Sequence, residues 1–427
     1  MREMKDSGIA WIGAMPRAWK MNTIAQIFLQ VKCKNTGLQE KNLLSLSYGK
    51  VKRKSIDTVE GLLPESFDGY NIIEKDDIVL RLTDLQNDHT SLRVGLAEER
   101  GIITSAYLTI RNRSNFCPKY LYYYLHSFDI AKGFYGMGAG VRQGLNWDGI
   151  KWLKILAPSV PEQERIAAFL DAECAEIDTV LEKTRASIEE YKKLKQAVIT
   201  QAVTKGIRGD RPMKGSGIEW IGEIPAGIPI SRVGLHFDIV LGKMLCSAPV
   251  DDNYTLESYY CAADVHFEGL SNGEKKKMWF SPDEKEQYCV KNGDLLVVEG
   301  GAGAGGCAIA ASTDVPIYIQ NSIMIVRSKG ISNIRYLRYL LECLVKKGYI
   351  DVVCNKATIP HFTKDKLANV PFIVFSQSEQ EEIAEYLNEK CAGIDALIVK
   401  KQQYLTEIEN YKKSLIYEYV TGKKEVV

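Results

Sequence analysis

Two stretches of this chain repeat one another, and this repeat constrains the fold more than any single motif. Residues 161–206 align without a gap with residues 378–423, at an offset of 217 positions. Identical residues stand at matched positions: Glu162 with Glu379, Cys174 with Cys391, and Asp178 with Asp395. An internal duplication of this length indicates a chain built from two equivalent halves.

Both copies of the repeat carry apolar residues at alternating spacings of three and four positions. These seam residues are Ile166, Leu170, Ile177 and Leu181 in the first copy, and Ile383, Leu387, Ile394 and Ile398 in the second. A seam sustained over several heptads predicts long helices of the coiled-coil type. At 1.5 Å rise per residue, about 44 residues give a rod on the order of 66 Å. Lys195 and Lys412 interrupt the seam at matched positions, which indicates a fixed register or a further contact.

The ends of both predicted helices carry their own signals. Ser159 and Ser378 each stand three residues before a glutamate, which fits a capping box. Gly206 and Gly422 stand where a C-terminal cap belongs, because glycine adopts the left-handed backbone conformation without strain.

The duplication extends beyond the helices. Trp11-Ile12-Gly13 recurs as Trp220-Ile221-Gly222, 209 positions later. A chain of 427 residues is also too long for a single hydrophobic core. We therefore expect a globular segment, a helix, a second globular segment and a second helix, with boundaries 1–159, 160–206, 207–376 and 377–427.

Each globular segment is predicted to be of the mixed α+β class. Matched strands and a following helix are expected at 77–82, 105–111 and 118–125 in the first segment, and at 294–299, 321–327 and 334–341 in the second. The middle parts of the two segments do not match, which favours two sites with similar tasks and different targets. If the helices pack antiparallel, a pseudo-two-fold axis relates the two segments. Paired readers on such an axis commonly bind DNA half-sites a fixed distance apart.

Composition excludes several classes of protein. Hydrophobic residues make up 45% of the chain, yet no apolar run reaches the length of a membrane span. Ten cysteines without a CxxC pair predict reduced thiols in a cytoplasmic protein, and the five histidines show no metal-ligand spacing. A net charge of +1 argues against a nonspecific nucleic-acid binder, so any DNA contact must come from local patches.

The glycine-rich run from Glu299 to Gly306 resembles a nucleotide-binding loop. Such a loop requires a helix directly after it, whose N-terminus holds phosphate. The following residues instead read as strands, so we expect a flexible loop that lets backbone approach a ligand. No nucleophile-and-base motif is present in the sequence, and we predict neither catalysis nor a cofactor.

Candidate DNA contacts are basic, amide and glycine-loop residues of the two globular segments. The first segment offers Lys50, Lys52, Arg53, Arg81, Thr83, Gln86, Arg93, Arg142 and Gln143, and the second offers Glu299, Gly301, Gly303, Asn321, Lys356, Thr358 and His361. In the major groove arginine pairs with guanine, and asparagine or glutamine with adenine, while lysine mostly contacts phosphate. Arg142 and His361 lie in corresponding loops, so we expect them to affect different half-sites.

Together these features give the sequence a resemblance, over essentially its whole length, to the specificity (S) subunit of type I restriction–modification systems. The resemblance is carried by the two WIG motifs, the run RLTDLQND at 81–88, and the twin helices that contain PEQERIAAFLD and SEQEEIAEYLN. It implies two target-recognition domains, each reading one half of a bipartite site in double-stranded DNA, with the helix pair as spacer. It also implies that the seam-bearing helices dock two methyltransferase (M) subunits, which carry S-adenosylmethionine and methylate adenine. Up to two restriction (R) subunits would join for cleavage, and the chain itself would be non-catalytic.

Two other classes of function stay open at this point. A scaffold protein that never touches DNA would explain the helices, but not two divergent globular segments. An enzyme that uses the glycine loop would bind a nucleotide or S-adenosylmethionine on its own.

Overall fold

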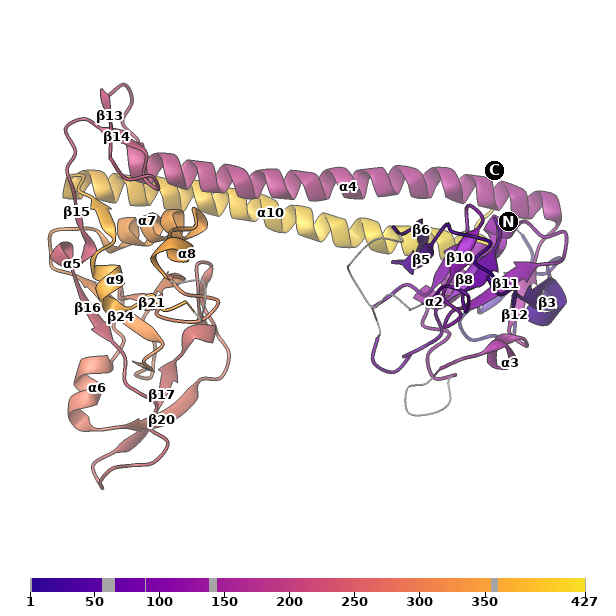
Figure 1. Ribbon diagram of the computed structural model, residues 1–427, viewed down its shortest axis with the longest axis horizontal. Helices are drawn as coiled ribbons and strands as arrows, with labels where there is room; N and C mark the ends of the chain where they lie inside the picture. Colours follow the sequence, from indigo (N-terminus) through magenta and orange to yellow (C-terminus); the bar gives the residue numbers. More distant parts are fainter. Residues whose placement is uncertain (1, 56–65, 89, 138–143, 355–359, 427) are drawn as a thin grey trace. The chain divides into compact units, whose positions relative to one another are not determined.

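The computed structural model of the chain describes residues 2–55, 66–88, 90–137, 144–354 and 360–426. These form two compact units: Met1–Arg185 with Gln402–Val427 is the first unit, and Ala186–Lys401 is the second. Two long helices, α4 (Val160–Lys205) and α10 (Gln377–Val420), contribute residues to both units (Figure 1). The predicted α+β class and the two long helices are confirmed. Within the described ranges, no helix is long and apolar enough to cross a membrane.

Each unit contains a four-stranded antiparallel sheet with the same strand order. In the first unit the order is β4 (Phe28–Gln30), β11 (Leu108–Asn112), β8 (Ile78–Leu80) and β9 (Val94–Leu96). In the second unit it is β16 (Phe237–Leu241), β24 (Ile323–Ser328), β21 (Leu295–Val298) and β22 (Cys307–Ile309). The predicted strands fall on β8, β11, β21 and β24, whose apolar residues are buried in the unit cores.

A helix connects each sheet to the long helices. These are α2 (Pro118–Ile130) and α7 (Ile334–Lys346), both at the predicted positions. The buried Tyr120 hydroxyl lies 3.0 Å from the Leu156 carbonyl oxygen and 3.3 Å from that of Val420 at the end of α10. In the second unit Tyr336 makes the equivalent contacts with Ile373, at 3.2 Å, and with Val203 of α4, at 3.0 Å. The helices α2 and α7 are thus tied to the end of a long helix in the same way.

The long helices pack antiparallel in each unit. In the first unit Lys412 Nζ donates to Asp178 at 2.6 Å, and Arg185 donates to Glu409 at 2.6 Å. In the second unit Lys195 Nζ donates to Asp395 at 2.7 Å. The repeat relates Asp178 to Asp395 and Lys412 to Lys195, so one ion pair is present twice, with the roles of the helices exchanged. The lysines that interrupt the predicted seam therefore have partners across it.

The helix ends agree with the sequence signals, with one correction. Gly206 and Gly422 adopt left-handed φ values of 76° and 73°, as predicted. Ser378 was expected to cap α10 but lies inside it. The cap is Ser376, whose hydroxyl accepts from the Glu379 backbone N–H at 3.3 Å. The helix starts earlier because Ser376, two positions upstream, offers the same hydroxyl.

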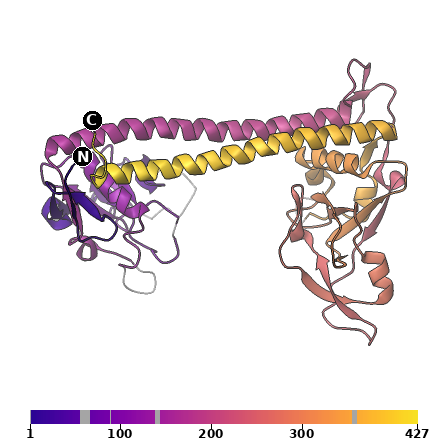
Figure 2. The same cartoon turned by 180° about the vertical axis from the view of Figure 1, so that it is seen from behind.

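The remaining elements of the first unit surround the sheet. They are β1 (Met4–Asp6), β2 (Ala14–Pro16), β3 (Lys20–Thr23), α1 (Ile24–Ile27), β5 (Leu44–Ser47), β6 (Lys50–Arg53), β7 (Asn71–Ile73), β10 (Gly101–Ile103), α3 (Trp147–Ile150) and β12 (Lys154–Ala157). The strands pair as β1–β2, β3–β12, β5–β6 and β7–β10. The two chain ends lie together in both views (Figures 1 and 2), joined by an ion pair of Arg2 with Glu425 at 3.0 Å.

The second unit repeats this frame and adds different parts. The repeated elements are β13 (Met213–Gly215), β14 (Glu223–Pro225), β15 (Ile230–Arg232), α5 (Val233–His236), α9 (Lys364–Ala368) and β25 (Pro371–Ile373). The added elements are β17 (Thr255–Tyr260), a 3-10 turn (Ala262–Asp264), β18 (Val265–His266), β19 (Gly269–Leu270), β20 (Lys276–Phe280), α6 (Pro282–Tyr288), β23 (Tyr318–Ile319) and α8 (Tyr349–Val353). Among them β20, β17 and β23 form a three-stranded sheet. The middle parts of the two globular segments therefore differ in structure as well as in sequence.

Candidate nucleic-acid interface

The first unit presents a basic hairpin, formed by β5 and β6. Lys50, Lys52 and Arg53 lie on β6 and are exposed to solvent. Arg53 pairs with Glu99, and Lys50 lies 3.6 Å from Asp178 of α4. Lysine and arginine on an exposed hairpin are groups that can contact DNA phosphates.

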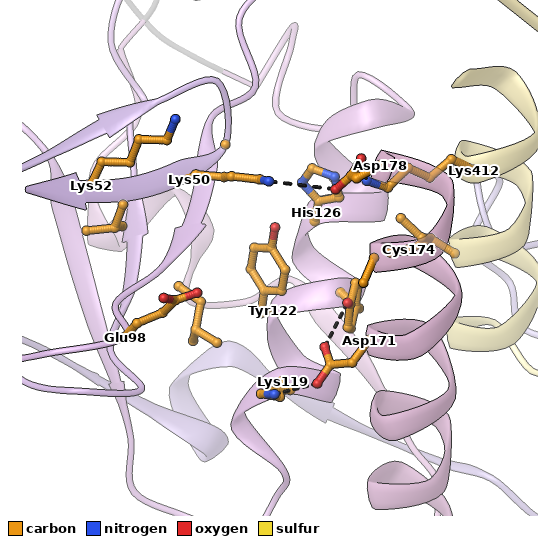
Figure 3. Close-up of a pocket in the computed structure, with 16 residues that line it drawn as sticks. Lys50, Lys52, Glu98, Lys119, Tyr122, His126, Asp171, Cys174, Asp178 and Lys412 are labelled. Atoms are coloured by element: carbon orange, nitrogen blue, oxygen red, sulfur yellow. Dashed lines mark hydrogen bonds and ion pairs between the residues drawn. The ribbon is translucent and has the colours of Figure 1, made fainter. Parts of the chain in front are cut away.

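A groove of about 450 Å³ lies between this hairpin and the helices of the first unit (Figure 3). Its walls come from β6, α2, α4 and α10. Lys412 holds Asp178 at 2.6 Å, and Asp171 accepts from Tyr123 at 2.8 Å and pairs with Lys119. The groove is therefore polar, and two of its acidic residues, Asp171 and Asp178, have cationic partners.

His126 lies at the floor of this groove and was not predicted as a site residue. It is buried, and its Nδ1 atom has no hydrogen-bond partner. Its ring stacks on Tyr122 with 5.5 Å between centroids (Figure 3). Burial, and then the charge of Lys412, lower the pKa of His126 to about 4. The imidazole is thus neutral at physiological pH. The only sequence signal was an (i, i+4) aromatic pair on α2, which is too common to identify a site.

Arg93 was predicted to contact DNA, but the structure contradicts a direct contact. Its side chain is fully buried and its guanidinium makes five hydrogen bonds of 2.5 to 3.3 Å. The acceptors are the Tyr135 hydroxyl and the carbonyl oxygens of Arg81, Thr83, Asp84 and Asp88. All five N–H donors of an arginine are then occupied. Arg93 therefore shapes the loop that carries other candidates, rather than reading a base.

The loop that Arg93 holds presents the neighbouring candidates to solvent. Thr83 and Gln86 are exposed, whereas Arg81 is half-buried and lies 3.7 Å from Asp88. The backbone N–H of Leu145 donates to the Leu82 carbonyl at 2.8 Å, which ties the following segment to this loop.

In the second unit the structure brings several predicted residues together at the glycine turn. His361 Nδ1 lies 3.2 Å from Glu299, and its backbone bridges to Gly300. A Cβ on Gly300 would lie 3.1 Å from His361 Nδ1, so a larger residue there would press on the imidazole. Gly301 has a left-handed φ of 90°. The chain then continues into β22, which confirms a loop between strands instead of a phosphate-binding helix start.

The other candidates of the second unit flank this turn. The Glu299 N–H donates to the Ser322 carbonyl at 2.8 Å, and Asn321 is the residue before Ser322. The Asn321 side chain accepts from Gln320 at 2.5 Å. Gly303 accepts from the Gly306 N–H within the turn. Arg142, Gln143, Lys356 and Thr358 lie outside the described residues.

The predicted partner-docking residues are mostly inside the chain's own cores. Ile166, Leu170, Ile177, Leu181, Ile383, Leu387 and Ile394 are buried, and Ile398 is half-buried. A partner subunit cannot contact the buried side chains directly, so this part of the prediction is corrected. The seam residues of the first helix share a core with α2, and Ile383 and Leu387 share a core with α7. The exposed faces of α4 and α10 are what remains for a partner.

No site for other chemistry is evident in the described ranges. They contain no group of three or more His, Cys, Asp or Glu side chains that could hold a metal ion. All ten cysteines are free thiols. Burial raises the pKa of Cys307 to about 12 and that of Cys391 to about 11, which makes both poor nucleophiles.

Part of the chain matches a known protein family. Residues 268–407 match the family model of the type I restriction modification DNA specificity domain. No curated protein sequence matched the chain. The class that the fold defines is a pair of α+β units on two long helices. The matched part of the chain is therefore similar to the DNA specificity domain of type I restriction–modification systems.

Solved structures share the fold along nearly the whole chain. One similar chain comes from a structure describing complex assembly and conformational transition of the type I R-M system, with a TM-score of 0.71 and 17% identity over 95% of this chain and 98% of that one. Another is the HsdS subunit from Thermoanaerobacter tengcongensis, with a TM-score of 0.53 and 15% identity over 96% of this chain and 98% of that one.

Proposed function

We propose that this chain gives a type I restriction–modification complex its DNA sequence specificity. The globular segments 1–159 and 207–376 act as two target-recognition domains, and each reads one half of a bipartite site in the major groove. The helical segments 160–206 and 377–427 act as the spacer that fixes the gap between the half-sites. The chain supplies recognition, and its partner subunits supply catalysis.

One observation carries this proposal. The two units share a frame of equivalent elements and contacts, but each frame bears a different set of outer elements. Tyr120 and Tyr336 tie α2 and α7 to the ends of the long helices through equivalent hydrogen bonds. The first unit adds the basic β5–β6 hairpin, and the second adds a three-stranded sheet and α6. Equivalent frames with different readers suit a DNA site whose two halves differ in sequence.

Specific residues are proposed for each half-site. In the first unit Lys50, Lys52 and Arg53 contact phosphates, while Thr83 and Gln86 lie on the loop that faces bases, with Arg81 at its base. In the second unit Glu299, Asn321 and His361 are the side chains placed to contact bases, and a carboxylate can accept a hydrogen bond from cytosine N4. Gly301 and Gly303 let the backbone approach. We also propose DNA contacts by four residues in the segments next to these loops: Arg142, Gln143, Lys356 and Thr358.

The partners proposed are double-stranded DNA, two methyltransferase subunits and restriction subunits that join for cleavage. The methyltransferase subunits contact exposed faces of α4 and α10, because the seam faces are buried. The chain's net charge of +1 suits a subunit that shares DNA contacts with its partners.

A selection experiment tests this function. The chain, purified together with its methyltransferase subunits, is incubated with a random-sequence DNA library, and the bound DNA is sequenced. We expect enrichment of two short blocks of defined sequence separated by a constant number of undefined bases. Enrichment that is the same without this chain, or a single undivided block, would refute the proposal.

His361→Ala should change the preferred bases in only one of the two blocks. The expected change is a discrimination loss of about 1 to 3 kcal/mol at one position, typical of a lost base contact. Lys52→Ala is the matched variant on the other unit and should weaken binding to all sequences without altering either block. A change in both blocks from His361→Ala would contradict the assignment of one block to each unit.

A further inference from the structure

Each unit begins with the same small hairpin. Residues 4–16, MKDSGIAWIGAMP, form β1, β2 and their loop, and residues 213–225, MKGSGIEWIGEIP, form β13, β14 and the matching loop. The two stretches are identical at 9 of 13 positions, whereas the repeats in the long helices are identical at only 16 of 46. In Figure 1 the β13–β14 hairpin projects from the second unit. Two units whose middle parts differ thus share one nearly unchanged surface element.

The fold explains several of the identical residues in the hairpin loops. Trp11 and Trp220 pack against the cores of their units. The Ser7 and Ser216 hydroxyls each accept from the backbone N–H two residues later, both at 3.1 Å. These residues are needed inside the chain, so their identity says nothing about a partner.

Two identical residues of each hairpin have no such internal task. Met4 and Met213 are 38% and 37% exposed, and Lys5 and Lys214 beside them are exposed as well. Within the described ranges neither lysine makes an ion pair. Exposed positions usually tolerate substitution at little cost in stability. The same exposed pair on both hairpins therefore indicates a contact outside the chain.

The backbone of β1 leaves one edge of its hairpin open. The Arg17 N–H donates to the Glu3 carbonyl at 2.8 Å, and the ladder bonds of an antiparallel pair fall on alternate residues. Met4 lies opposite Pro16, which has no N–H, so the N–H and C=O of Met4 point away from β2. In the part of the chain that the structure describes, β1 and β2 form a two-stranded sheet of their own. No strand therefore lies beside the outer edge of β1.

The second unit repeats this open edge. The Ala226 N–H donates to the Pro212 carbonyl at 2.8 Å, and Met213 lies opposite Pro225. Among the described strands, β13 pairs only with β14. The outward N–H and C=O groups of an open edge pair readily with an extended segment of another chain.

We infer that each open edge binds an extended segment of one methyltransferase subunit, which adds a strand beside β1 or β13; this rests on the proposed function. The occupant must be present in two identical copies, because both units offer the same edge with the same exposed side chains. DNA does not meet this requirement, since its two half-sites are proposed to differ. The methyltransferase subunit is proposed in two copies and therefore meets it.

The exposed side chains define the chemistry of the bound segment. In strand addition the main-chain hydrogen bonds supply affinity, and side chains beside the edge supply specificity. An apolar residue of the segment suits Met4 or Met213, because methionine adapts to apolar neighbours of varied shape. An acidic residue suits Lys5 or Lys214, because opposite charges on neighbouring strands attract.

Proline substitutions on the edge strands test this inference. Met4→Pro removes the outward N–H of β1 and keeps the ladder to β2, since an edge strand tolerates proline where the N–H faces solvent. Met213→Pro does the same on β13. Glu3→Pro is the matched control, because it adds a proline at the next residue, where the second unit already has Pro212.

The full-length variants are titrated with the methyltransferase subunit in the absence of restriction subunits. Wild type should bind two copies, and each single variant, Met4→Pro or Met213→Pro, should weaken one of the two binding steps by about tenfold or more. The double variant should weaken both steps. Glu3→Pro should stay within about twofold of wild type at both steps, because its N–H does not lie on the open edge.

A charge reversal gives a second reading that does not depend on proline. Lys5→Glu with Lys214→Glu should weaken both steps by about threefold or more, since like charges on neighbouring strands repel. Both lysines are exposed, so the Tm of the isolated chain should stay at the wild-type value.

Several results would overturn the inference. Wild-type affinity at both steps in the proline and glutamate variants would remove the hairpins from the interface and leave the proposed function intact. Unchanged methyltransferase binding with weakened binding of a restriction subunit, of DNA or of a second copy of this chain would identify a different occupant. Failure of the wild-type chain to bind the methyltransferase subunit at all would refute the proposed partnership together with this inference.

Discussion

Arg93 and Lys52 carry the same charge in the first unit but have different tasks. The Arg93 guanidinium is surrounded by backbone carbonyls of one loop, whereas Lys52 is solvent-exposed on a hairpin. A buried charge is stable only when hydrogen bonds replace the water it has lost. Sequence alone could not separate the two residues, because both lie in polar stretches with turn-forming neighbours.

Arg93→Ala should lower the free energy of unfolding by roughly 3 kcal/mol, because several buried carbonyls lose their donor. Lys52→Ala should stay within about 0.5 kcal/mol of wild type, as exposed substitutions usually do. Urea unfolding of both variants measures this difference. An Arg93→Ala chain as stable as wild type would mean that the loop does not depend on Arg93.

His126 gives the first unit a pH-dependent stability. The unfolded chain binds a proton at this histidine below about pH 6.5, whereas the folded chain resists it until the pH reaches about 4. Stability is therefore fully present above the unfolded pKa and falls as the pH drops from 6.5 towards 4. Asp129, whose pKa burial raises to about 6, acts in the opposite direction between about 6 and 3.8. Because the two groups act in opposite directions, the pH profile of the wild-type chain alone does not show the contribution of either one.

His126→Gln removes one of these two opposing contributions. Relative to its own value at pH 7.5, the variant should lose less stability than wild type at pH 5, by roughly 2 kcal/mol from the pKa difference. Chemical unfolding of both chains at the two pH values measures this. Parallel pH profiles for the two chains would show that His126 is protonated in the folded state at pH 5.

At the scale of elements, the reciprocal ion pairs of α4 and α10 explain why lysines interrupt both seams. Lys195 reaches Asp395 and Lys412 reaches Asp178. A polar residue at a seam position costs stability and specifies register. The side chains are partly exposed, so each pair is expected to contribute modestly.

A double-mutant cycle on Lys195→Ala and Asp395→Ala should give a coupling free energy of about 0.5 to 1 kcal/mol that decreases with added salt. The charge-swapped chain, with Lys195→Asp and Asp395→Lys, should recover most of the stability lost by either reversal alone. Urea unfolding at low and high salt measures both quantities. Additive single variants would show that the observed contact contributes no register preference.

Some features of the helices and strands could be predicted from the sequence, and others could not. The helix seams, the matched strands and the C-terminal glycines were predictable, because periodicity and backbone conformation are local properties. The cap at Ser376 was missed because two serines compete within one turn. The burial of Arg93 and the groove at His126 depend on contacts between distant segments, such as Arg93 with Tyr135, which no local pattern encodes.

At the scale of the whole molecule, we propose that the spacer helices set the gap between the half-sites. Inserting one heptad into both helices at the unit boundary keeps the seam in register. Seven residues add about 10 Å of helix, which corresponds to about three base pairs. We expect a longer gap in the selected DNA and no change in either half-site. An unchanged gap would show that the helices do not set the spacing of the half-sites.

The most direct test of the central claim is a map of N6-methyladenine along DNA from a host without adenine methylation of its own. The host expresses this chain together with its methyltransferase subunit, and a matched culture expresses the methyltransferase subunit alone. We expect methylation at an asymmetric two-part motif with a constant gap, present only when this chain is expressed. Methylation at a single undivided motif, or a pattern that is the same without the chain, would contradict it.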